Sequence, residues 1–362
     1  MKRALCLFAL LLFFTCSAAA SGTWYTFPTD SPPPGLGFRI TEASGTVTVT
    51  FLGDCVLGGE TSTRKWDRGF FRRVRDQGYE YPFRGLTALT LSDDLTVANL
   101  ECVLTDRDLP KVEKAFNFSG PAAYTGILTA GGVECVTVAN NHSKDFGTEG
   151  YNDTREALAQ ASVAYFGTDD LAVWESDDGL LIGFIGVSGG LSGRAEKIYR
   201  AQARALRDIG CHAVITVMHV GQEYSYTPNA TQRRVAAIAA EEGSALVVGH
   251  HPHVVQGYEM IGDVPAVYSL GNCAFGGNRN PADYDALALQ ADLTFEETKL
   301  TGVRLRFYPI SVSGSKNAND YSPVLLSGGD AERVLEKMTK STGYGFTPWS
   351  AETGAEATYE KR

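Results

Sequence analysis

The chain has 362 residues, of which 44% are apolar, enough for one large domain or two ordinary domains with a substantial core. Its formal net charge is −10. We therefore expect no nucleic-acid partner, because a surface that follows phosphates needs clustered Lys and Arg, and this acidic balance predicts no such cluster.

The first twenty residues are typical of a secretory signal peptide. Lys2 and Arg3 precede an apolar run at 4–14, and small residues at 17–20 then offer a cleavage site. The run is shorter than the about 20 apolar residues that a bilayer-spanning helix needs. We predict a secreted or extracytoplasmic protein, which an uncleaved leader would anchor to the membrane.

Residues 21–44 are predicted to be a linker, because the Ser-Pro-Pro-Pro-Gly run at 31–35 favours an extended, polyproline-like chain. Five cysteines follow the leader. This number is odd and the spacing lacks the density of a disulfide framework, so we expect free thiols.

Within residues 45–311, short apolar runs alternate with helical patterns. Six runs predict strands, at 47–52, 95–98, 133–139, 180–187, 213–218 and 245–248. Four helical patterns lie between several of these strands, at 121–130, 148–161, 194–209 and 229–242. Such alternation, with nearly continuous apolar strands, is typical of a largely parallel sheet that is covered on both faces.

The later part of the chain follows another pattern. Apolar runs at 264–270, 286–295 and 300–310 succeed one another with turn signals and no helix, so we expect antiparallel strands there. Residues 312–362 are predicted to be a C-terminal extension with a short helix at 330–340 and a loose tail. The predicted fold class is therefore α/β with mixed sheets.

Five of the six histidines lie at the ends of predicted strands. His142 closes the third strand, His219 follows the fifth, and three more lie in the pentad at 249–253 after the sixth. Imidazole is the commonest metal ligand in proteins and the usual near-neutral acid–base group. Because ligands bind at the carboxyl ends of strands in open α/β sheets, the sequence predicts a metal-dependent site there.

Other metal-binding or acid–base side chains follow the remaining strands. Asp54 follows the first strand, Asn99 and Glu101 follow the second, and Asn141 precedes His142. Each motif also has a purely structural explanation, since Gly-Asp is a common turn and Asn-Asn-His would cap the next helix through an Asx turn. The agreement of five strand ends is what favours a functional site.

The pentad Gly-His-His-Pro-His is the strongest of these motifs. In an extended strand, residues two apart point to the same side, so His251 and His253 would face one ion while His250 points away. Pro252 between them fixes φ and stiffens that arrangement.

The ligand types indicate which metal the site would hold. Imidazole, carboxylate and amide groups suit Mn, Zn or Fe better than magnesium or calcium. There are enough of them for two ions, which such sites hold roughly 3.5–4 Å apart. Asp54 and Glu101 are the natural bridging residues, because a carboxylate has two oxygens. The expected cofactor is one or two divalent transition metals.

The motifs come in an order that resembles a known family. Six of them carry the similarity: FLGD at 51–54, ANLE at 98–101, ANNH at 139–142 with DFG at 145–147, HVGQEY at 219–224, VGHHPH at 248–253 and YSLGN at 268–272. Over residues 45–310 the chain resembles the CapA-type poly-γ-glutamate capsule biosynthesis proteins of the calcineurin-like metallophosphoesterase superfamily. The resemblance implies a four-layer α-β-β-α sandwich.

The resemblance also implies a role for each matched residue. It assigns metal binding to Asp54, Asn99 or Glu101 (the bridging position), Asn141, His219, His251 and His253, and assistance of the leaving group to His142. The chain departs from the superfamily at two places. Val56 stands where a metal-binding His is general, and the segment 99–101 replaces a bridging Asp. One metal position is thereby short of a ligand.

We therefore predict a secreted, metal-dependent hydrolase or transferase of the cell envelope, which acts in capsule or poly-γ-glutamate synthesis, attachment or turnover. Its ions would activate water and polarise a phosphoryl or amide group, with His142 as general acid. Glu223 is either a second acid–base group or a solvated loop carboxylate. The expected partners are an anionic envelope polymer or its precursor and a membrane-bound polymer synthase.

Two other functions fit the same residues. One is an amidase that acts on γ-glutamyl or wall peptides with the same ligands. The other is a non-catalytic assembly or binding protein, whose degenerate site only recognises the polymer. Val56 favours this second alternative, whereas the presence of His142, His219 and His251 opposes it.

Overall fold

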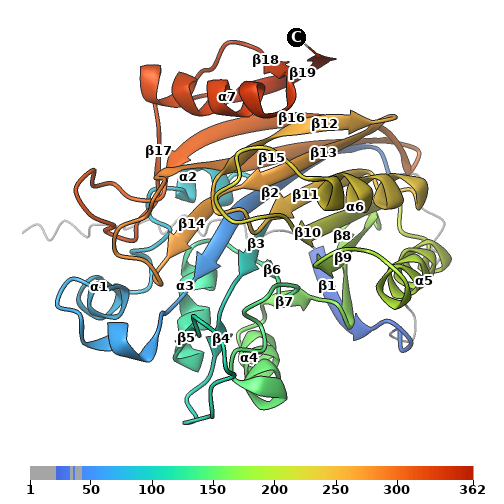
Figure 1. Cartoon of the computed structure of the whole chain (residues 1–362). Helices are drawn as coiled ribbons and strands as arrows, with labels where there is room; N and C mark the ends of the chain where they lie inside the picture. The colour runs from blue at the N-terminus through green and yellow to red at the C-terminus, as the bar shows by residue number, and fades with distance from the viewer. Residues whose placement is uncertain (1–21, 33–35, 37–42, 362) are drawn as a thin grey trace, which may run out of the picture.

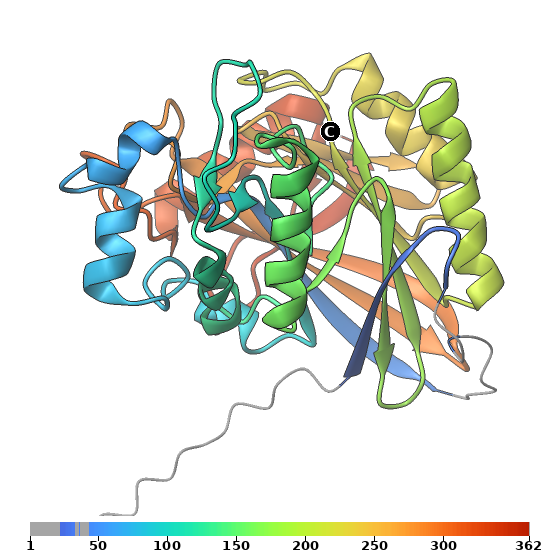
Figure 2. The ribbon, with the colours of Figure 1, turned by 90° about the horizontal axis from the view of Figure 1, so that it is seen from below.

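The computed structural model describes residues 22–32, 36 and 43–361, so the predicted leader lies outside the described residues. In this part of the chain, two mixed sheets pack face to face and helices cover both outer faces (Figure 1; a second view in Figure 2). The order α-β-β-α confirms the predicted four-layer α/β fold.

The larger sheet has ten strands. Its parallel part consists of β2 (Gly45–Val56), β3 (Leu95–Leu100), β6 (Cys135–Thr137) and β7 (Ala164–Phe166). Antiparallel strands continue from the other edge of β2: β15 (Asp285–Glu296), β16 (Lys299–Ser311), β19 (Ala355–Lys361) and β18 (Tyr344–Phe346). Two short strands complete the sheet, β14 (Asn272–Phe275) beside β2 and β17 (Val324–Leu325) beside β16.

The smaller sheet has seven strands, in the order β1 (Gly22–Pro28), β8 (Asp170–Ser176), β9 (Leu181–Ser188), β10 (Ala213–His219), β11 (Leu246–His250), β13 (Val264–Leu270) and β12 (Val255–Ile261). The strands from β9 to β13 are parallel to one another, and β1, β8 and β12 are antiparallel to their neighbours. The antiparallel prediction for 264–270 is therefore wrong on the side of β11. The strand at 264–270 is antiparallel only to β12, and the apolar pattern does not predict β12 as a strand.

The five predicted helices are present and correspond to α3 to α7, whereas α1 and α2 are not predicted. The outer face of the smaller sheet packs against α5 (Arg194–Ile209) and α6 (Ala230–Glu241). The larger sheet packs against α1 (Phe70–Gln77), α2 (Thr87–Thr90), α3 (Thr125–Ala130) and α4 (Gly147–Gln160), with the 3₁₀ turns η1 (Thr61–Lys65) and η2 (Ala122–Tyr124). A last helix, α7 (Gly328–Thr342), lies along β12 and β16. A two-stranded ladder, β4 (Val103–Leu104) with β5 (Ser119–Gly120), lies beside α4.

The predicted linker contains an edge strand. β1 pairs with β8 over its whole length, with Trp24 opposite Trp174. Phe27 is buried under the helices of the smaller sheet. The linker prediction for 21–44 is therefore wrong at 22–28, because aromatic side chains give this segment apolar surface to bury. Most of the proline-rich run lies outside the described residues.

The predicted loose tail is also part of the sandwich. β18 and β19 pair with each other, and β19 pairs with β16. Phe346, Ala355 and Ala357 join the core between the sheets. The Gly, Thr and Glu of this segment suggest a tail, but small apolar residues two apart put one face of β19 against the core.

Two further observations, on cysteines and on membrane-spanning helices, apply to the described residues. The five cysteines found there are all free, as predicted. None of the helices that the structure describes is long and apolar enough to cross a membrane.

Phe346→Ala tests whether the C-terminal strands stabilise the sandwich. Phe346 is 8% exposed, and its ring packs edge-on against Phe307 with centroids 5.1 Å apart. Because truncation leaves a cavity, we expect the free energy of unfolding in urea to fall by about 3 kcal/mol. Glu332→Ala, at an exposed position of α7, should change it by less than about 0.5 kcal/mol. Equal, small effects of both would contradict the assignment of this segment to the core.

Asp292→Asn tests an ion-pair cluster on the larger sheet. Asp292 of β15 accepts hydrogen bonds from Arg304 and Arg306 of β16, each at 2.7 Å from the nearest nitrogen. Burial alone would raise the pKa of Asp292, but the hydrogen bonds from Arg306, Thr48 and Arg304 hold it below its usual range. The carboxylate therefore stabilises the fold fully above the ordinary Asp pKa of about 3.9, and this contribution is lost as the pH falls through the lower folded value.

We expect Asp292→Asn to lose about 2 kcal/mol of unfolding free energy at neutral pH. The difference from the parent chain should shrink below about pH 4, where the parent chain loses the same interaction. Urea denaturation at both pH values measures it. A difference that stays constant would rule out the charge of Asp292 as its cause.

Candidate metal centre

The predicted site residues meet where parallel strands of both sheets end. Asp54 lies in β2 and Glu101 directly follows β3 in the larger sheet. His219 ends β10 and His250 ends β11 in the smaller sheet. The site therefore depends on both sheets, and neither one contains it alone.

Two glycines allow the backbone to come close at these strand ends. A Cβ on Gly53 would lie 2.2 Å from the carbonyl oxygen of Gly271, and one on Gly249 would lie 2.1 Å from that of Tyr268. The same carbonyl of Gly271 accepts a hydrogen bond from the N–H of Asp54 at 2.9 Å. Only glycine permits such contacts, so these positions fix where Asp54 and the histidine pentad lie.

Glu101 lies at the centre of the site. Its side chain is fully buried, and neither carboxylate oxygen has a hydrogen-bond partner among the described residues. Its Oε1 lies 3.4 Å from Nε2 of His219 and 3.9 Å from Nε2 of His253. Burial raises the pKa of Glu101 to about 7. A buried carboxylate without donors is costly unless a cation balances it, so this position favours a positive ion.

Asp54 is the second buried carboxylate. Its Oδ1 accepts a hydrogen bond from Nδ2 of Asn99 at 2.8 Å and lies 3.1 Å from Nδ1 of His250. Its Oδ2 lies 3.1 Å from Nδ1 of His253 and accepts from the backbone N–H of His251 at 3.2 Å. Burial alone would raise the pKa of Asp54, but hydrogen bonds with His250 and His253 hold it well below its usual range. Asp54 is thus ionised, as a metal-binding carboxylate must be.

His219 brings several ligand atoms together. Burial lowers its pKa to about 3, so the imidazole is neutral, which is its metal-binding form. Its Nε2 lies 2.8 Å from Oδ1 of Asn141 and 3.0 Å from Nδ1 of His251. Burial and the neighbouring His219 lower the pKa of His251 as well. The three side chains converge on one point beside Glu101.

The residues after β11 form a turn, and the prediction of an extended strand through 249–253 is wrong. β11 ends at His250, and φ is positive at His251 (96°) and at His253 (58°). The turn still brings His251 and His253 to Glu101. The expectation that His250 points away is also wrong, because its Nδ1 lies beside Asp54. A period-two pattern holds only while the backbone stays extended.

His253 lies between the two carboxylates. Burial would lower its pKa, but Glu101 and Asp54 raise it to about 10. Its Nδ1 also lies 2.9 Å from Oδ1 of Asn272. Asp54 and Glu101 thus attract positive charge to this point, which a proton or a metal ion can supply.

Among the residues that the structure describes, two groups could hold a metal ion: Asp54, Glu101 and His219, and Glu101, His251 and His253. In each group the ligand atoms lie within 4.8 Å of one another. Glu101 belongs to both groups, as a bridging carboxylate would. Their nitrogen and oxygen atoms suit Mn, Zn or Fe, so the residues fit one or two transition-metal ions.

Asn99 lies two residues before Glu101 but has a different role in the site. Its Nδ2 donates to Asp54 at 2.8 Å, and its Oδ1 accepts from Nδ2 of Asn140 at 2.9 Å. Since both amide atoms are engaged, Asn99 positions Asp54. The structure therefore favours Glu101 over Asn99 as the metal-binding residue of this segment.

His142 lies at the edge of the site and is held from several sides. Its Nδ1 lies 2.7 Å from Oδ2 of Asp145, which also accepts the N–H of Phe118 at 2.6 Å. The Phe118 ring packs on the imidazole with centroids 4.5 Å apart. Lys114 contacts Asp145, and its Nζ lies 3.2 Å from Nδ1 of His142. Such contacts fix the orientation that a proton-transferring group needs.

Two predicted positions lie outside the cluster of ligands. Glu223 is exposed in the loop after β10 and belongs to neither metal group, although its charge contributes to the raised pKa of His253. Val56 is fully buried in the apolar layer between the larger sheet and its helices. Position 56 therefore supplies no metal-binding atom.

The sequence motifs assign no role to several residues that the structure places in the site. Asp145 and Asn272 lie inside the motifs at 145–147 and 268–272, which is the signal that could have identified them. Asn140 precedes Asn141 and holds Asn99. Lys114 comes from a loop without any periodic pattern, so only the folded chain reveals its contact with His142.

Comparison with known proteins shows similarity along most of the chain. Capsule biosynthesis protein CapA of Bacillus anthracis is 25% identical, over 84% of this chain and 75% of its own length. PGA biosynthesis protein CapA of Bacillus subtilis (strain 168) is 24% identical, over 87% and 82% respectively. The crystal structure of TT1561 of Thermus thermophilus has a TM-score of 0.40 and 12% identity, over 67% of this chain and 94% of that one.

A family profile gives the assignment. The profile described as bacterial capsule synthesis protein PGA_cap matches residues 48–277. The matched region runs from β2 to just past β14 and includes all the residues of the metal centre described above, from Asp54 to Asn272. The chain therefore belongs to the bacterial capsule synthesis protein PGA_cap family.

Proposed function

We propose that this protein is a metal-dependent hydrolase or transferase that acts in the synthesis, attachment or turnover of a capsule polymer. Membership of the PGA_cap family supports the capsule role. One observation above all supports the metal chemistry: the Glu101 carboxylate is fully buried without a hydrogen-bond donor among the described residues. The imidazoles of His219 and His253 lie around it.

The chemistry divides between the ion and the chain. A bound transition metal would polarise a phosphoryl or amide group and increase the acidity of water. Asp54 and Glu101 supply the negative charge that holds such an ion. His142, oriented by Asp145, is placed to give a proton to a leaving group. Glu223, at the exposed rim, is the second candidate for proton transfer.

Two alternatives share this site. A γ-glutamyl or wall-peptide amidase would use the same ligands, and only the bond that is cleaved separates it from a phosphoesterase. The buried Val56 supports a non-catalytic alternative, because the site has fewer ligands there than the superfamily pattern provides. The site would then recognise or anchor the polymer without cleaving it.

The proposal includes a place of action and partners. The leader pattern at 1–20 supports a location outside the cytoplasm, where an uncleaved leader would act as an anchor. The substrate would be an anionic envelope polymer or its precursor, and a membrane-bound polymer synthase would be the partner.

Metal content is the first test. We expect the purified chain to bind manganese, zinc or iron, and Glu101→Gln and His251→Ala each to weaken binding at least about 100-fold, because both remove a ligand. His212→Gln is the matched control, since His212 lies outside the site and accepts a hydrogen bond from the N–H of Leu181. Elemental analysis and metal titration measure the effect. If the parent chain binds none of the three metals, the proposed metal chemistry is wrong.

Activity is the second test. The metal-loaded chain should hydrolyse a generic phosphodiester or a γ-glutamyl amide, and His142→Ala should lower kcat about 10²- to 10⁴-fold while keeping the metal. Asp145→Asn should cause a smaller loss, since it removes only the orientation of His142. Cleavage of the amide alone would identify the amidase. If a metal-loaded chain cleaves neither compound, the non-catalytic alternative replaces the enzyme.

A further inference from the structure

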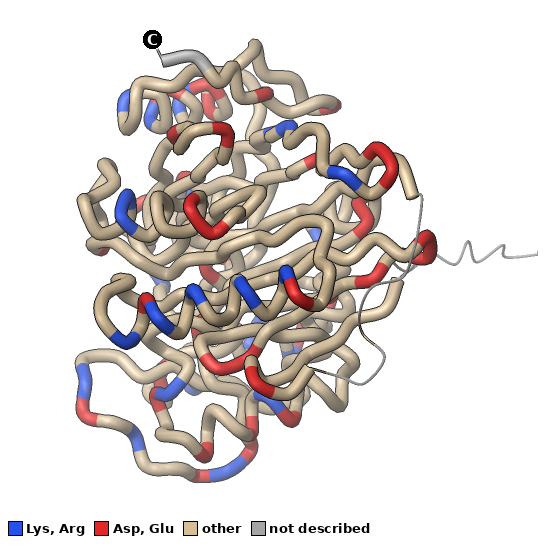
Figure 3. The backbone as a smooth tube through the Cα atoms, turned by 90° about the vertical axis from the view of Figure 1, so that its right-hand side faces the viewer, with Lys and Arg blue, Asp and Glu red and all other residues tan. Residues whose placement is uncertain are grey.

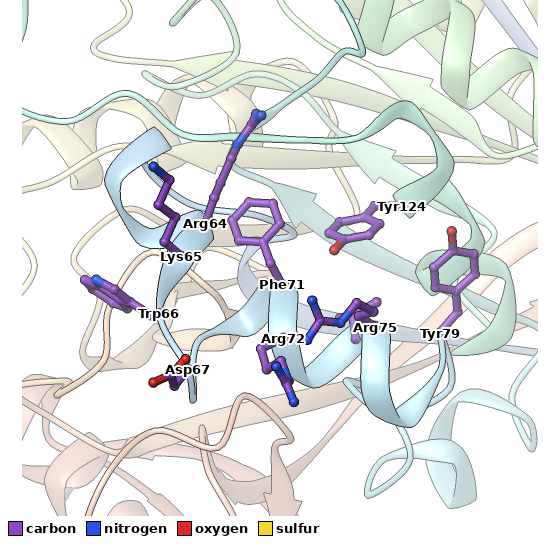
Figure 4. Close-up of a pocket in the computed structure, with 10 residues that line it drawn as sticks. Arg64, Lys65, Trp66, Asp67, Phe71, Arg72, Arg75, Tyr79 and Tyr124 are labelled. Carbon is purple, nitrogen blue, oxygen red and sulfur yellow. The ribbon is translucent and has the colours of Figure 1, made fainter.

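A second pocket lies on the outer face of the larger sheet's helices. It has a volume of 510 Å³ and is formed by η1, α1 and the aromatic residues Tyr79 and Tyr124 (Figure 4). The close-up shows the side chains of Arg64 and Lys65 from one side and those of Arg72 and Arg75 from the other around the Phe71 ring. None of these residues belongs to the metal centre.

The pocket is basic in an acidic protein. Four of the residues that line it are cations (Arg64, Lys65, Arg72 and Arg75), and one, Asp67, is an anion. Arg72 and Arg75 both pair with Asp76. In the part of the chain that the structure describes, no carboxylate forms an ion pair with Arg64 or Lys65. The prediction that no basic cluster exists is therefore wrong at this place.

The side of the protein that lies away from α1, at the right of Figure 1, carries charges of both signs. On the side seen in Figure 3, Lys and Arg are interspersed with Asp and Glu. Arg200 of α5, for example, pairs with Glu196, Glu241 and Glu242. The excess of four cations over one anion in the lining of the pocket favours an anionic ligand.

The floor of the pocket is aromatic, and its rings pack on one another. Phe71 and Tyr79 each lie against Tyr124, with centroids 5.9 and 6.0 Å apart. The guanidinium of Arg64 lies 5.6 Å from the centre of the Phe71 ring. Because these rings contact each other and Arg64, they act as an apolar floor that strengthens the field of the cations.

One hydrogen bond connects the pocket to a segment that contacts the metal centre. Arg64 donates to the hydroxyl of Ser119 at 3.2 Å. Ser119 follows Phe118, whose ring packs on His142. Arg64 also lines a neighbouring cavity of 310 Å³ together with Lys111. The pocket is thus connected to His142 through Arg64, Ser119 and Phe118.

We propose that this pocket binds the carboxylates of an anionic polymer chain and holds the polymer beside the metal centre. Guanidinium groups match carboxylates in pairs of hydrogen bonds, and the pocket presents several of them on one side of the molecule. The choice of a polycarboxylate rests on the proposed capsule function. The charge and the volume of the pocket and the hydrogen bond from Arg64 to Ser119 do not depend on that function.

Binding of a fluorescently labelled, short oligomer of γ-linked glutamate to the full chain tests the proposal. The double variant Arg64→Gln/Lys65→Gln should weaken binding about tenfold or more, because both cations are exposed and without an acidic partner. The matched control, Lys197→Gln/Arg204→Gln, makes the same charge change at exposed positions of α5 and should alter the Kd less than about twofold. Thermal unfolding shows that both variants are folded.

The other outcomes overturn the proposal. These are a parent chain that does not bind the oligomer, an equal loss in the control, and a loss in His251→Ala that the pocket variant does not share. Tighter, pocket-dependent binding of an oligonucleotide of equal charge would also replace the carboxylate ligand by a nucleic acid. Metal content, measured on the same samples, separates the two proposals: oligomer binding without metal contradicts only the metal chemistry, and metal binding without oligomer binding contradicts only the pocket.

Discussion

Two buried carboxylates, Asp54 and Glu101, are the constraint on which the rest of the site depends. Taking a carboxylate out of water costs several kcal/mol, and Glu101 has no hydrogen-bond donor among the described residues to offset that cost. The imidazoles that face it, those of His219, His251 and His253, come from the other sheet and the turn after β11. The apolar core between the sheets therefore has two functions, because it stabilises the sandwich and brings the carboxylates and imidazoles together.

The sequence alone predicts much of this arrangement, for a specific reason. Ligands gather at the carboxyl ends of parallel strands, and the positions of Asp54, Glu101 and His219 could be inferred from apolar runs that end in polar residues. The local backbone could not be predicted in the same way. Pro252 favours an extended conformation with negative φ at the residue before it, His251, so the pentad predicts the opposite of the positive φ that the structure shows there.

Composition was informative about the whole chain and misleading about its parts. A net charge of −10 is a sum over all residues, and it conceals the basic segment that contains Arg64 and Arg75. In the same way, the Gly, Thr and Glu of the C-terminal segment conceal the alternation of Ala355 and Ala357, which face the core. The basic segment can be read from the local sequence at 64–75, whereas the face that Ala355 and Ala357 share is a property of the fold.

The turn after β11 has a consequence for the protein without metal. Positive φ at His251 and His253 costs on the order of 1–3 kcal/mol at each residue, and this strain is stored next to the centre. Glycine would remove the strain at either position and would remove the imidazole with it. Metal ligation would offset the strain by tying both rings to Glu101, so the ion would act as a local staple for the β11–β12 connection as well as a reagent. Loss of the metal would then lower both the local stability of the β11–β12 connection and the activity of the protein.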